Sequence, residues 1–268
     1  MTIEHILKAC STSFAVIFLG TLLIVGIFLI IRAYQIKAKN FYFIGIAWSL
    51  EALAQILNQV TSLPESIYAI FSKLSFILII IFIILTFYNH QKPKKKYYII
   101  AISVILALIA WFFAAIRTSS QVAYVTNRIF DVIINSIALD WLAYSCYTAY
   151  QNIKNSNIAQ WVKMRYKITF IFSPILTSIY FILIFHPYNV PFGDESNTLS
   201  LIIYALTAII TLIYGISFVI AWIFPRKIKR IFSKDIQKTE EEEELIDEDK
   251  IIELIKKQLS TGKSNGDH

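Results

Sequence analysis

The residues best suited to chemistry lie in an otherwise apolar stretch in the middle of the chain. Asn127, Arg128, Asp131 and Asn135 fall on one broad face of an α-helix, whereas Asp140 lies on another face, about three turns further along. Arg128 and Asp131 are three residues apart, so they can pair within the helix. Hydrocarbon tolerates charged and amide side chains only where they face protein or water. The stretch therefore predicts a polar centre inside a membrane bundle.

Two earlier apolar segments carry further polar residues. Glu51, Gln55 and Asn58 follow one another at helical spacing and share one face. Lys73 lies about two turns from the end of the next segment, where a lysine either extends to the membrane interface or meets a buried partner, and the sequence leaves both open. Asp140 is expected to accept a hydrogen bond between helices. The predicted ligand-pocket residues are Glu51, Gln55, Asn58, Lys73, Asn127, Arg128, Asp131 and Asn135.

This polar centre has two interpretations. In the first, it is a pocket open to the outside, in which Arg128 or Lys73 meets an anionic group and Glu51 or Asp131 meets a cationic one. In the second, it is an internal network of ion pairs and amides that orders the bundle and needs no ligand. The residue types fit either interpretation.

The composition indicates the elements that must position these residues. The chain has 268 residues, of which 57% are hydrophobic, and its mean hydropathy is +0.61. A soluble domain is usually roughly 45–50% apolar, and a membrane-spanning helix needs about 20 apolar residues. We therefore predict an all-α polytopic membrane protein, a seven-transmembrane-helix bundle in residues 1–232. Its spans are expected at about residues 14–31, 41–60, 67–88, 97–116, 122–150, 166–185 and 198–224.

The basic residues predict the orientation of the bundle. Of the 25 Lys and Arg residues, 15 flank the spans on one side of the membrane, whereas only Lys8 and Arg117 flank them on the other. This bias predicts an external N-terminus and a cytoplasmic C-terminus in a multi-pass protein of the cell membrane. The net charge of +7 then reflects topology and does not indicate a nucleic-acid partner. Basic residues expected at the anionic inner leaflet are Lys94, Lys95, Lys96, Arg226, Lys227, Lys229 and Arg230.

Three further segments have distinct compositions. Pro174 lies inside the sixth span, where it is expected to kink the helix. The segment His186–Asn197 is the longest external loop and the best candidate for a lid. Residues 233–268 form an acidic cytoplasmic tail, in which Glu240–Leu259 is predicted to be a short helix able to recruit a basic partner.

Several chemistries are excluded by the residues that the chain lacks. All four histidines lie at chain ends or in loops, so no histidine cluster is predicted within the membrane for haem or zinc. The sequence contains no glycine-rich phosphate loop and no G-x-S-x-G nucleophile elbow. We therefore expect a protein that is not an enzyme and that uses neither a metal nor a cofactor.

In outline, seven helices with an external N-terminus resemble rhodopsins and G-protein-coupled receptors. The seventh span has no lysine for a retinal Schiff base, and Thr86–His90 replaces the D-R-Y motif of the receptors. SWEET sugar transporters share the topology, but their paired prolines are missing here. The segment Ala221–Pro225, before a basic patch, is similar to the ends of uncharacterised prokaryotic, chiefly archaeal, seven-helix proteins. This resemblance implies a receptor-like or sensor-like topology.

Three functions are consistent with these features. The leading hypothesis is a receptor-like or sensor-like protein with an outward-facing pocket for a small polar or charged ligand. The alternative is a secondary transporter or ion pathway, in which Glu51, Asp131 and Asp140 relay a cation or proton. The third is a membrane scaffold that recruits partners through its tail.

Overall fold

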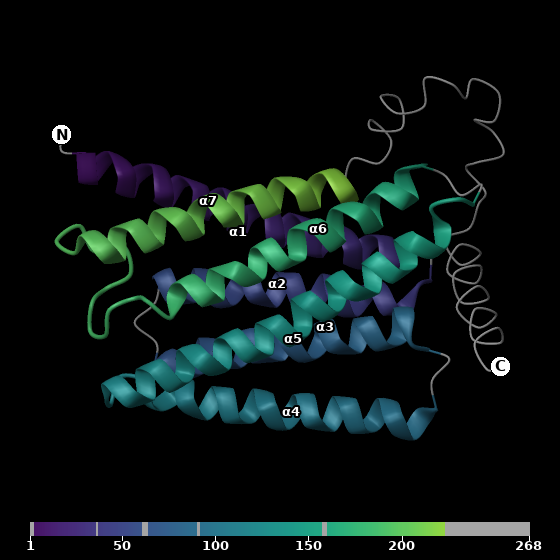
Figure 1. Cartoon of the computed structure of the whole chain (residues 1–268), viewed down its shortest axis with the longest axis horizontal. Helices are drawn as coiled ribbons and strands as arrows, with labels where there is room; N and C mark the ends of the chain where they lie inside the picture. Colours follow the sequence, from purple (N-terminus) through teal and green to yellow (C-terminus); the bar gives the residue numbers. More distant parts are fainter. Residues whose placement is uncertain (1–2, 36, 61–63, 90–91, 157–159, 223–268) are drawn as a thin grey trace.

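The computed structural model describes residues 3–35, 37–60, 64–89, 92–156 and 160–222. Within these residues it contains seven α-helices, each long and apolar enough to cross a membrane. The protein is therefore an all-α integral membrane protein with several spans, as the hydropathy predicts. The helices are α1 (Ile3–Gln35), α2 (Lys39–Val60), α3 (Glu65–Phe87), α4 (Pro93–Ile116), α5 (Gln121–Ile153), α6 (Gln160–Leu183) and α7 (Thr198–Trp222) (Figure 1).

Every predicted span corresponds to one helix, but α1 and α6 begin earlier than hydropathy suggests. The polar first turns of α1 contact Glu195 in the connection between α6 and α7, where Lys8 forms an ion pair with its carboxylate and His5 Nδ1 lies 2.5 Å from it. The first turn of α6 is held by Lys163, which donates to two backbone carbonyls at and just after the end of α5. Such polar anchors lie outside an apolar window, so hydropathy alone places these helix starts too late.

The helices lie side by side along one long axis of the molecule (Figure 1). The start of α1, the turn between α4 and α5 and the connection between α6 and α7 gather at one end, which we call the N-terminal end of the bundle. The charge bias of the sequence predicts that this end is extracellular.

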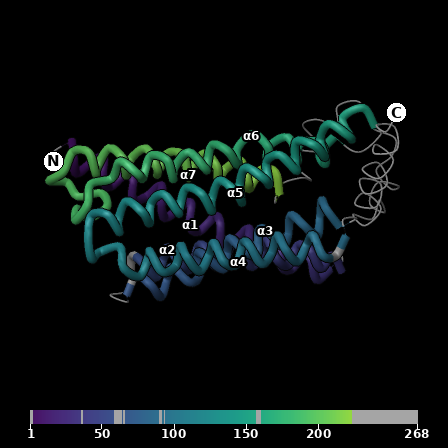
Figure 2. Tube along the Cα trace, turned by 60° about the horizontal axis from the view of Figure 1, so that its bottom comes forward, coloured from purple at the N-terminus to yellow at the C-terminus, as the bar shows by residue number. Residues whose placement is uncertain are grey.

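Six helices form a closed ring, and α4 lies outside it. In the ring, α1 packs on α2 and α7, α3 packs on α2 and α5, and α6 packs on α5 and α7. Helix α4 contacts only α3 and α5 among the major helix pairs. Figure 2 shows α5, α6 and α7 on one side of the bundle and α2, α3 and α4 on the other. Side chains that point into the ring therefore come from both layers.

Two glycines let the backbones of α1 and α2 meet. A Cβ atom added to Gly26 would lie 2.7 Å from the carbonyl oxygen of Gly45, and one added to Gly45 would lie 2.8 Å from that of Gly26. Gly20, two turns away on α1, has no such neighbour within 4 Å. Small residues at helix crossings are a common device of membrane bundles, because they increase van der Waals contact.

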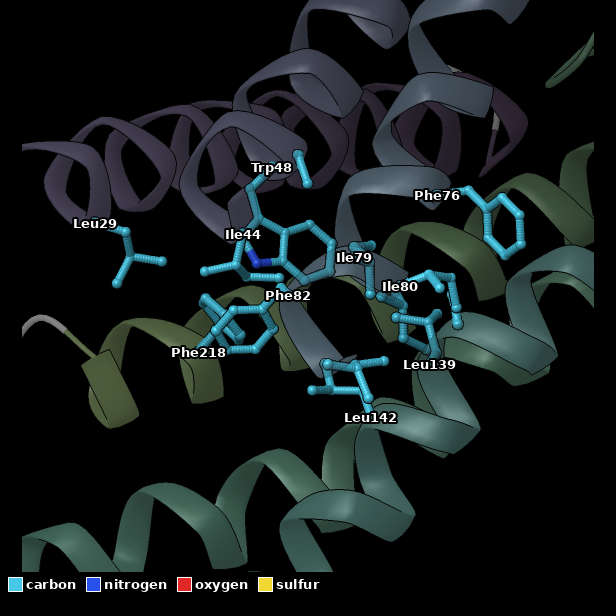
Figure 3. Close-up of a cluster of buried hydrophobic side chains, with 14 of the residues drawn as sticks. Leu29, Ile44, Trp48, Phe76, Ile79, Ile80, Phe82, Leu139, Leu142 and Phe218 are labelled. Carbon is cyan, nitrogen blue, oxygen red and sulfur yellow. The ribbon is translucent and has the colours of Figure 1, made fainter. Parts of the chain in front are cut away.

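Away from the N-terminal end, buried apolar side chains form one large cluster inside the ring. Figure 3 shows side chains from α1, α2, α3, α5 and α7 converging on one cluster. Trp48 of α2 reaches across to α7, where its ring centroid lies 6.0 Å from that of Tyr214 and 5.4 Å from that of Phe218. Such edge and tilted contacts between large rings give the core a defined packing.

The structure describes some of the basic residues predicted at the inner leaflet, and the proline predicted to kink the sixth span. Lys94 and Lys95 are exposed in the first turn of α4, whereas Lys96 donates to the backbone and side-chain oxygens of Asn89. Pro174 lies within α6, and the kink expected there stays a prediction. The predictions for Arg226, Lys227, Lys229, Arg230 and the tail helix Glu240–Leu259 lie outside the described residues.

Candidate polar site between the helices

An ion pair between α3 and α5 forms the centre of the site. Lys73 Nζ lies 2.5 Å from Asp131 Oδ1, and their side chains are only 10% and 16% exposed. Asn127 Nδ2 donates to the other carboxylate oxygen of Asp131 at 3.2 Å. Lys73 therefore meets a buried partner and does not extend to the interface. Three of the eight predicted residues meet here.

The pair between Arg128 and Asp131 that their spacing allows does not form. Helical side chains lean toward the N-terminus of their helix, so Arg128 reaches back one turn to Tyr124. Its Nη2 donates to the Tyr124 hydroxyl at 3.2 Å, and its guanidinium carbon lies 5.0 Å from the centre of that ring. Arg128 Nε is buried without a hydrogen-bond partner, and no described carboxylate lies within 4.0 Å of the guanidinium. The Asp131 carboxylate therefore accepts from Lys73 and Asn127 and not from Arg128.

A line of hydrogen bonds continues from Tyr124 into the connection between α6 and α7. The Tyr124 hydroxyl lies 2.8 Å from His186 Nδ1, and His186 Nε2 lies 3.0 Å from Ser200 Oγ at the start of α7. Ser200 Oγ donates its proton to the carbonyl of Pro191 at 2.8 Å. It must therefore accept from His186, which assigns the proton of a neutral imidazole to Nε2 and leaves Nδ1 to accept from Tyr124.

The charges around this line favour a neutral His186. Burial lowers the pKa of His186 below its usual value, and the nearby cations Arg128 and Arg117 lower it further. Burial likewise lowers the pKa of Arg117, at the end of α4, to about 10, and Arg128 contributes to the shift. Arg117 and Arg128 therefore lie close enough at this end of the bundle for each to disfavour a further positive charge on His186.

The segment expected to act as a lid is tied down at several points. Besides the bonds of His186 and Ser200, the Tyr188 hydroxyl donates to the carbonyl of Thr118 at 3.0 Å. The ring of Phe192 packs on Tyr204 of α7 with centroids 5.1 Å apart. The connection between α6 and α7 therefore forms a fixed cover over the N-terminal end of α5.

Glu51 enters the same region from α2. Gln55 Nε2 donates to Glu51 Oε1 at 3.0 Å, one helical turn away. The Tyr180 hydroxyl on α6 lies within electrostatic reach of both Glu51 and Asp131. Among the described residues, no Lys or Arg nitrogen lies within 4.0 Å of the Glu51 carboxylate. Glu51 is therefore a second charged group without an oppositely charged neighbour.

The remaining predicted residues are less involved. Asn135 donates to the backbone carbonyl of Asp131, so its amide is used within its own helix. Gln55 and Asn58 are exposed side chains on α2. Asp140 is exposed on the outer side of α5 and accepts a hydrogen bond of 3.0 Å from Thr177 of α6, which confirms the expected role between helices.

Sequence reasoning missed four members of the site: Tyr124, Tyr180, His186 and Ser200. His186 was set aside because it follows a span, and Tyr180 belongs to a polar stripe that resembles ordinary helix packing. A usable signal existed for Ser200, since it opens a regular stripe of hydroxyl residues along α7. For His186, the only local signal was its place in a loop rich in proline and aromatic residues.

Neither a metal cluster nor a similar protein assigns a role to this site. Among the described residues, no group of three or more His, Cys, Asp or Glu side chains could hold a metal ion. No family model, curated protein or solved structure matches the chain. Its function therefore has to be argued from its own residues.

Proposed function

We propose that the protein is a receptor-like or sensor-like membrane protein, not an enzyme, that binds a small charged ligand between its helices. The ligand would lie near the N-terminal end of the bundle, among α2, α3, α5 and α6. One observation carries the proposal: Glu51 and Arg128 are charged groups of opposite sign, and each lacks an oppositely charged side chain within 4.0 Å among the described residues.

The cost of membrane burial supports this proposal. A charged side chain at the centre of a bilayer costs about 2.5–3.5 kcal/mol on insertion scales, and such residues usually mark functional sites. Lys73 and Asp131 offset this cost by neutralising each other. Glu51 and Arg128 have no such compensation, so a ligand that pairs with either of them would recover part of the cost.

The hydrogen-bond line offers a route by which binding could change the shape of the protein. Arg128 donates to Tyr124, which donates to His186, and His186 connects α5 to α7 through Ser200. A ligand that draws Arg128 away from Tyr124 would alter the bonding that holds the connection between α6 and α7. Binding energy that differs between two arrangements is what shifts their populations.

A thermal-shift screen of the purified protein against polar metabolites tests this function. A true ligand should raise the unfolding temperature of the wild type, and Glu51→Gln or Arg128→Gln should reduce that rise. Asp140→Asn is the matched control, because Asp140 is a carboxylate on the outer side of α5 and its loss should leave the response intact. A response unchanged in both site variants would refute the site.

The two other functions stay predictions of the sequence. A cation or proton pathway would require Glu51, Asp131 and Asp140 to act in series, and it predicts flux into proteoliposomes that disappears in Glu51→Gln. Recruitment of a partner by the tail concerns residues outside the described part of the chain.

A further inference from the structure

Two neighbouring residues of α5 hold unused hydrogen-bonding atoms of opposite kind. Arg128 Nε is a buried donor without a partner, and Asn127 Oδ1 is a buried acceptor without a partner. Buried polar atoms in native proteins are almost always hydrogen-bonded, so each such atom needs an explanation. Two of them on consecutive residues, on the face that turns toward α3 and the cover, suggest one common cause.

The orientation of Asn127 is fixed by its other bond. Its Nδ2 donates to Asp131 Oδ2, and an exchange of the amide nitrogen and oxygen would set two acceptors against each other. Asn127 is only 1% exposed, so bulk water does not satisfy Oδ1. The available group at this position is therefore an acceptor, which calls for an N–H or O–H donor.

The unpaired Nε–H of Arg128 requires an acceptor, and the positive charge of the guanidinium favours an anionic one. Arg128 Nη2 is bonded to the Tyr124 hydroxyl and the guanidinium lies over the Tyr124 ring, whereas Nε has no acceptor among the described residues. Asp131, the nearest carboxylate along its own helix, is already bonded to Lys73 and Asn127. Arg128 as a residue is only partly buried, but its Nε is buried, so a ligand reaches this atom by entering between the helices. Arginine also binds carboxylates in a fork that no other side chain reproduces.

We propose that the ligand is a small organic acid with a hydroxyl or ammonium group next to its carboxylate. The carboxylate binds Arg128, and the neighbouring donor binds Asn127 Oδ1. An α-amino acid or an α-hydroxy acid has this pair of groups on adjacent atoms. This assignment rests on the proposed function and narrows it to one chemical class of ligand.

A phospholipid headgroup is a second source of an oxyanion near the membrane surface. It would satisfy Arg128 but would not need to bring a donor to the buried Asn127. The two sources are separated by placing the protein in nanodiscs of either zwitterionic or anionic lipid. If anionic lipid alone stabilises the wild type through Arg128, and soluble acids add nothing in either lipid, the proposal is wrong.

The probes are the common amino acids and the α-hydroxy acids glycolate, lactate and malate, each added to the wild type in zwitterionic nanodiscs. For every probe that raises the unfolding temperature, two analogues are then tested. In the first, an amide replaces the carboxylate and removes its charge. In the second, the hydroxyl or ammonium group is absent, which removes the donor to Asn127. The amide analogue loses a hydrogen bond between charged groups and should bind about tenfold to a hundredfold more weakly. The unsubstituted acid loses a bond to the neutral Asn127 amide and should bind about twofold to tenfold more weakly. If no acid among the probes binds, the proposal is overturned.

Two variants connect the binding to the named atoms. Arg128→Lys keeps the charge but loses the planar fork, and should weaken binding about tenfold. Asn127→Leu removes the acceptor, and should abolish the preference for a hydroxy acid over the plain acid. The preference is the ratio of the affinities for the hydroxy acid and the plain acid, both measured on the same variant, so it does not depend on how far the substitution lowers overall stability. Arg165→Lys is the control, since Arg165 lies at the opposite end of the bundle and donates to the carbonyl of Ala221.

The outcomes also separate this inference from the proposed function. If neutral or cationic metabolites bind in a manner that Glu51→Gln abolishes, while organic acids do not, the protein remains receptor-like and the acid assignment fails. If no compound of any class binds, both fail.

Discussion

Removing one member of the Lys73–Asp131 pair should be far more damaging than removing both. In Lys73→Met the Asp131 carboxylate stays buried without its cation, and in Asp131→Leu the ammonium is left without its anion. With side-chain exposures of 10% and 16%, neither charge can be solvated by water without moving. Breaking a buried pair in this way costs about 3–5 kcal/mol.

The combined variant should recover most of that loss. If the two single costs were additive, the double variant would lose about 6–10 kcal/mol. With both charges gone, the main remaining loss is the hydrogen bond from Asn127 Nδ2, and such bonds contribute about 0.6 to 1.7 kcal/mol in membrane bundles. The double variant should therefore lie within about 2 kcal/mol of the wild type.

Reversible unfolding in mixed micelles, followed by tryptophan fluorescence, would measure these free energies. Lys163→Met provides the control, because Lys163 is a buried lysine that donates to carbonyls near the end of α5 and has no contact with Asp131. Its combination with Asp131→Leu should be additive. If Lys73→Met and Asp131→Leu were also additive, the two charges would not stabilise each other, and the central pair of the site would be refuted.

Three other changes test separate parts of the structure. Gly26→Ala forces apart the crossing of α1 and α2 and should lower the free energy of unfolding by about 1–3 kcal/mol, whereas Gly20→Ala, in open space, should be neutral or slightly stabilising. Because the folded pKa of His186 is lowered, the unfolded state binds more protons, so stability should fall as the pH drops below about 6.5. His186→Gln should flatten that profile, and an unchanged slope would assign it to another group. A membrane-impermeant maleimide should label the exposed Cys10 on intact cells and spare the buried Cys146; labelling of Cys10 only after lysis would reverse the predicted orientation.

The seven spans could be predicted from the sequence because a single property decides them. About 20 consecutive apolar residues form a helix in a bilayer whatever their neighbours are, since the backbone has no other way to satisfy its hydrogen bonds. The same reasoning placed Glu51, Arg128 and Asp131 in a polar centre and left Lys73 open between the membrane interface and a buried partner. It could not predict their partners, because those depend on helix rotation and on which helices are adjacent in the ring.

The Arg128 prediction shows why local spacing was misleading. A three-residue separation allows a pair with Asp131, but a lysine 58 residues earlier in the chain takes that carboxylate. His186 was missed for a related reason, since its partners Tyr124 and Ser200 lie 62 and 14 residues away. The pattern of residues along a single helix cannot predict contacts with such distant parts of the chain.

The same sequence separation has a consequence for biosynthesis. Lys73 is made before Asp131, and at about 5–20 residues per second the ribosome needs roughly 3 to 12 s to advance the 58 positions from one to the other. During that interval α3 has to carry an unneutralised lysine, which its otherwise very apolar sequence allows it to do. The delay between the two charges is therefore set by translation, and slow codons between α3 and α5 would prolong it.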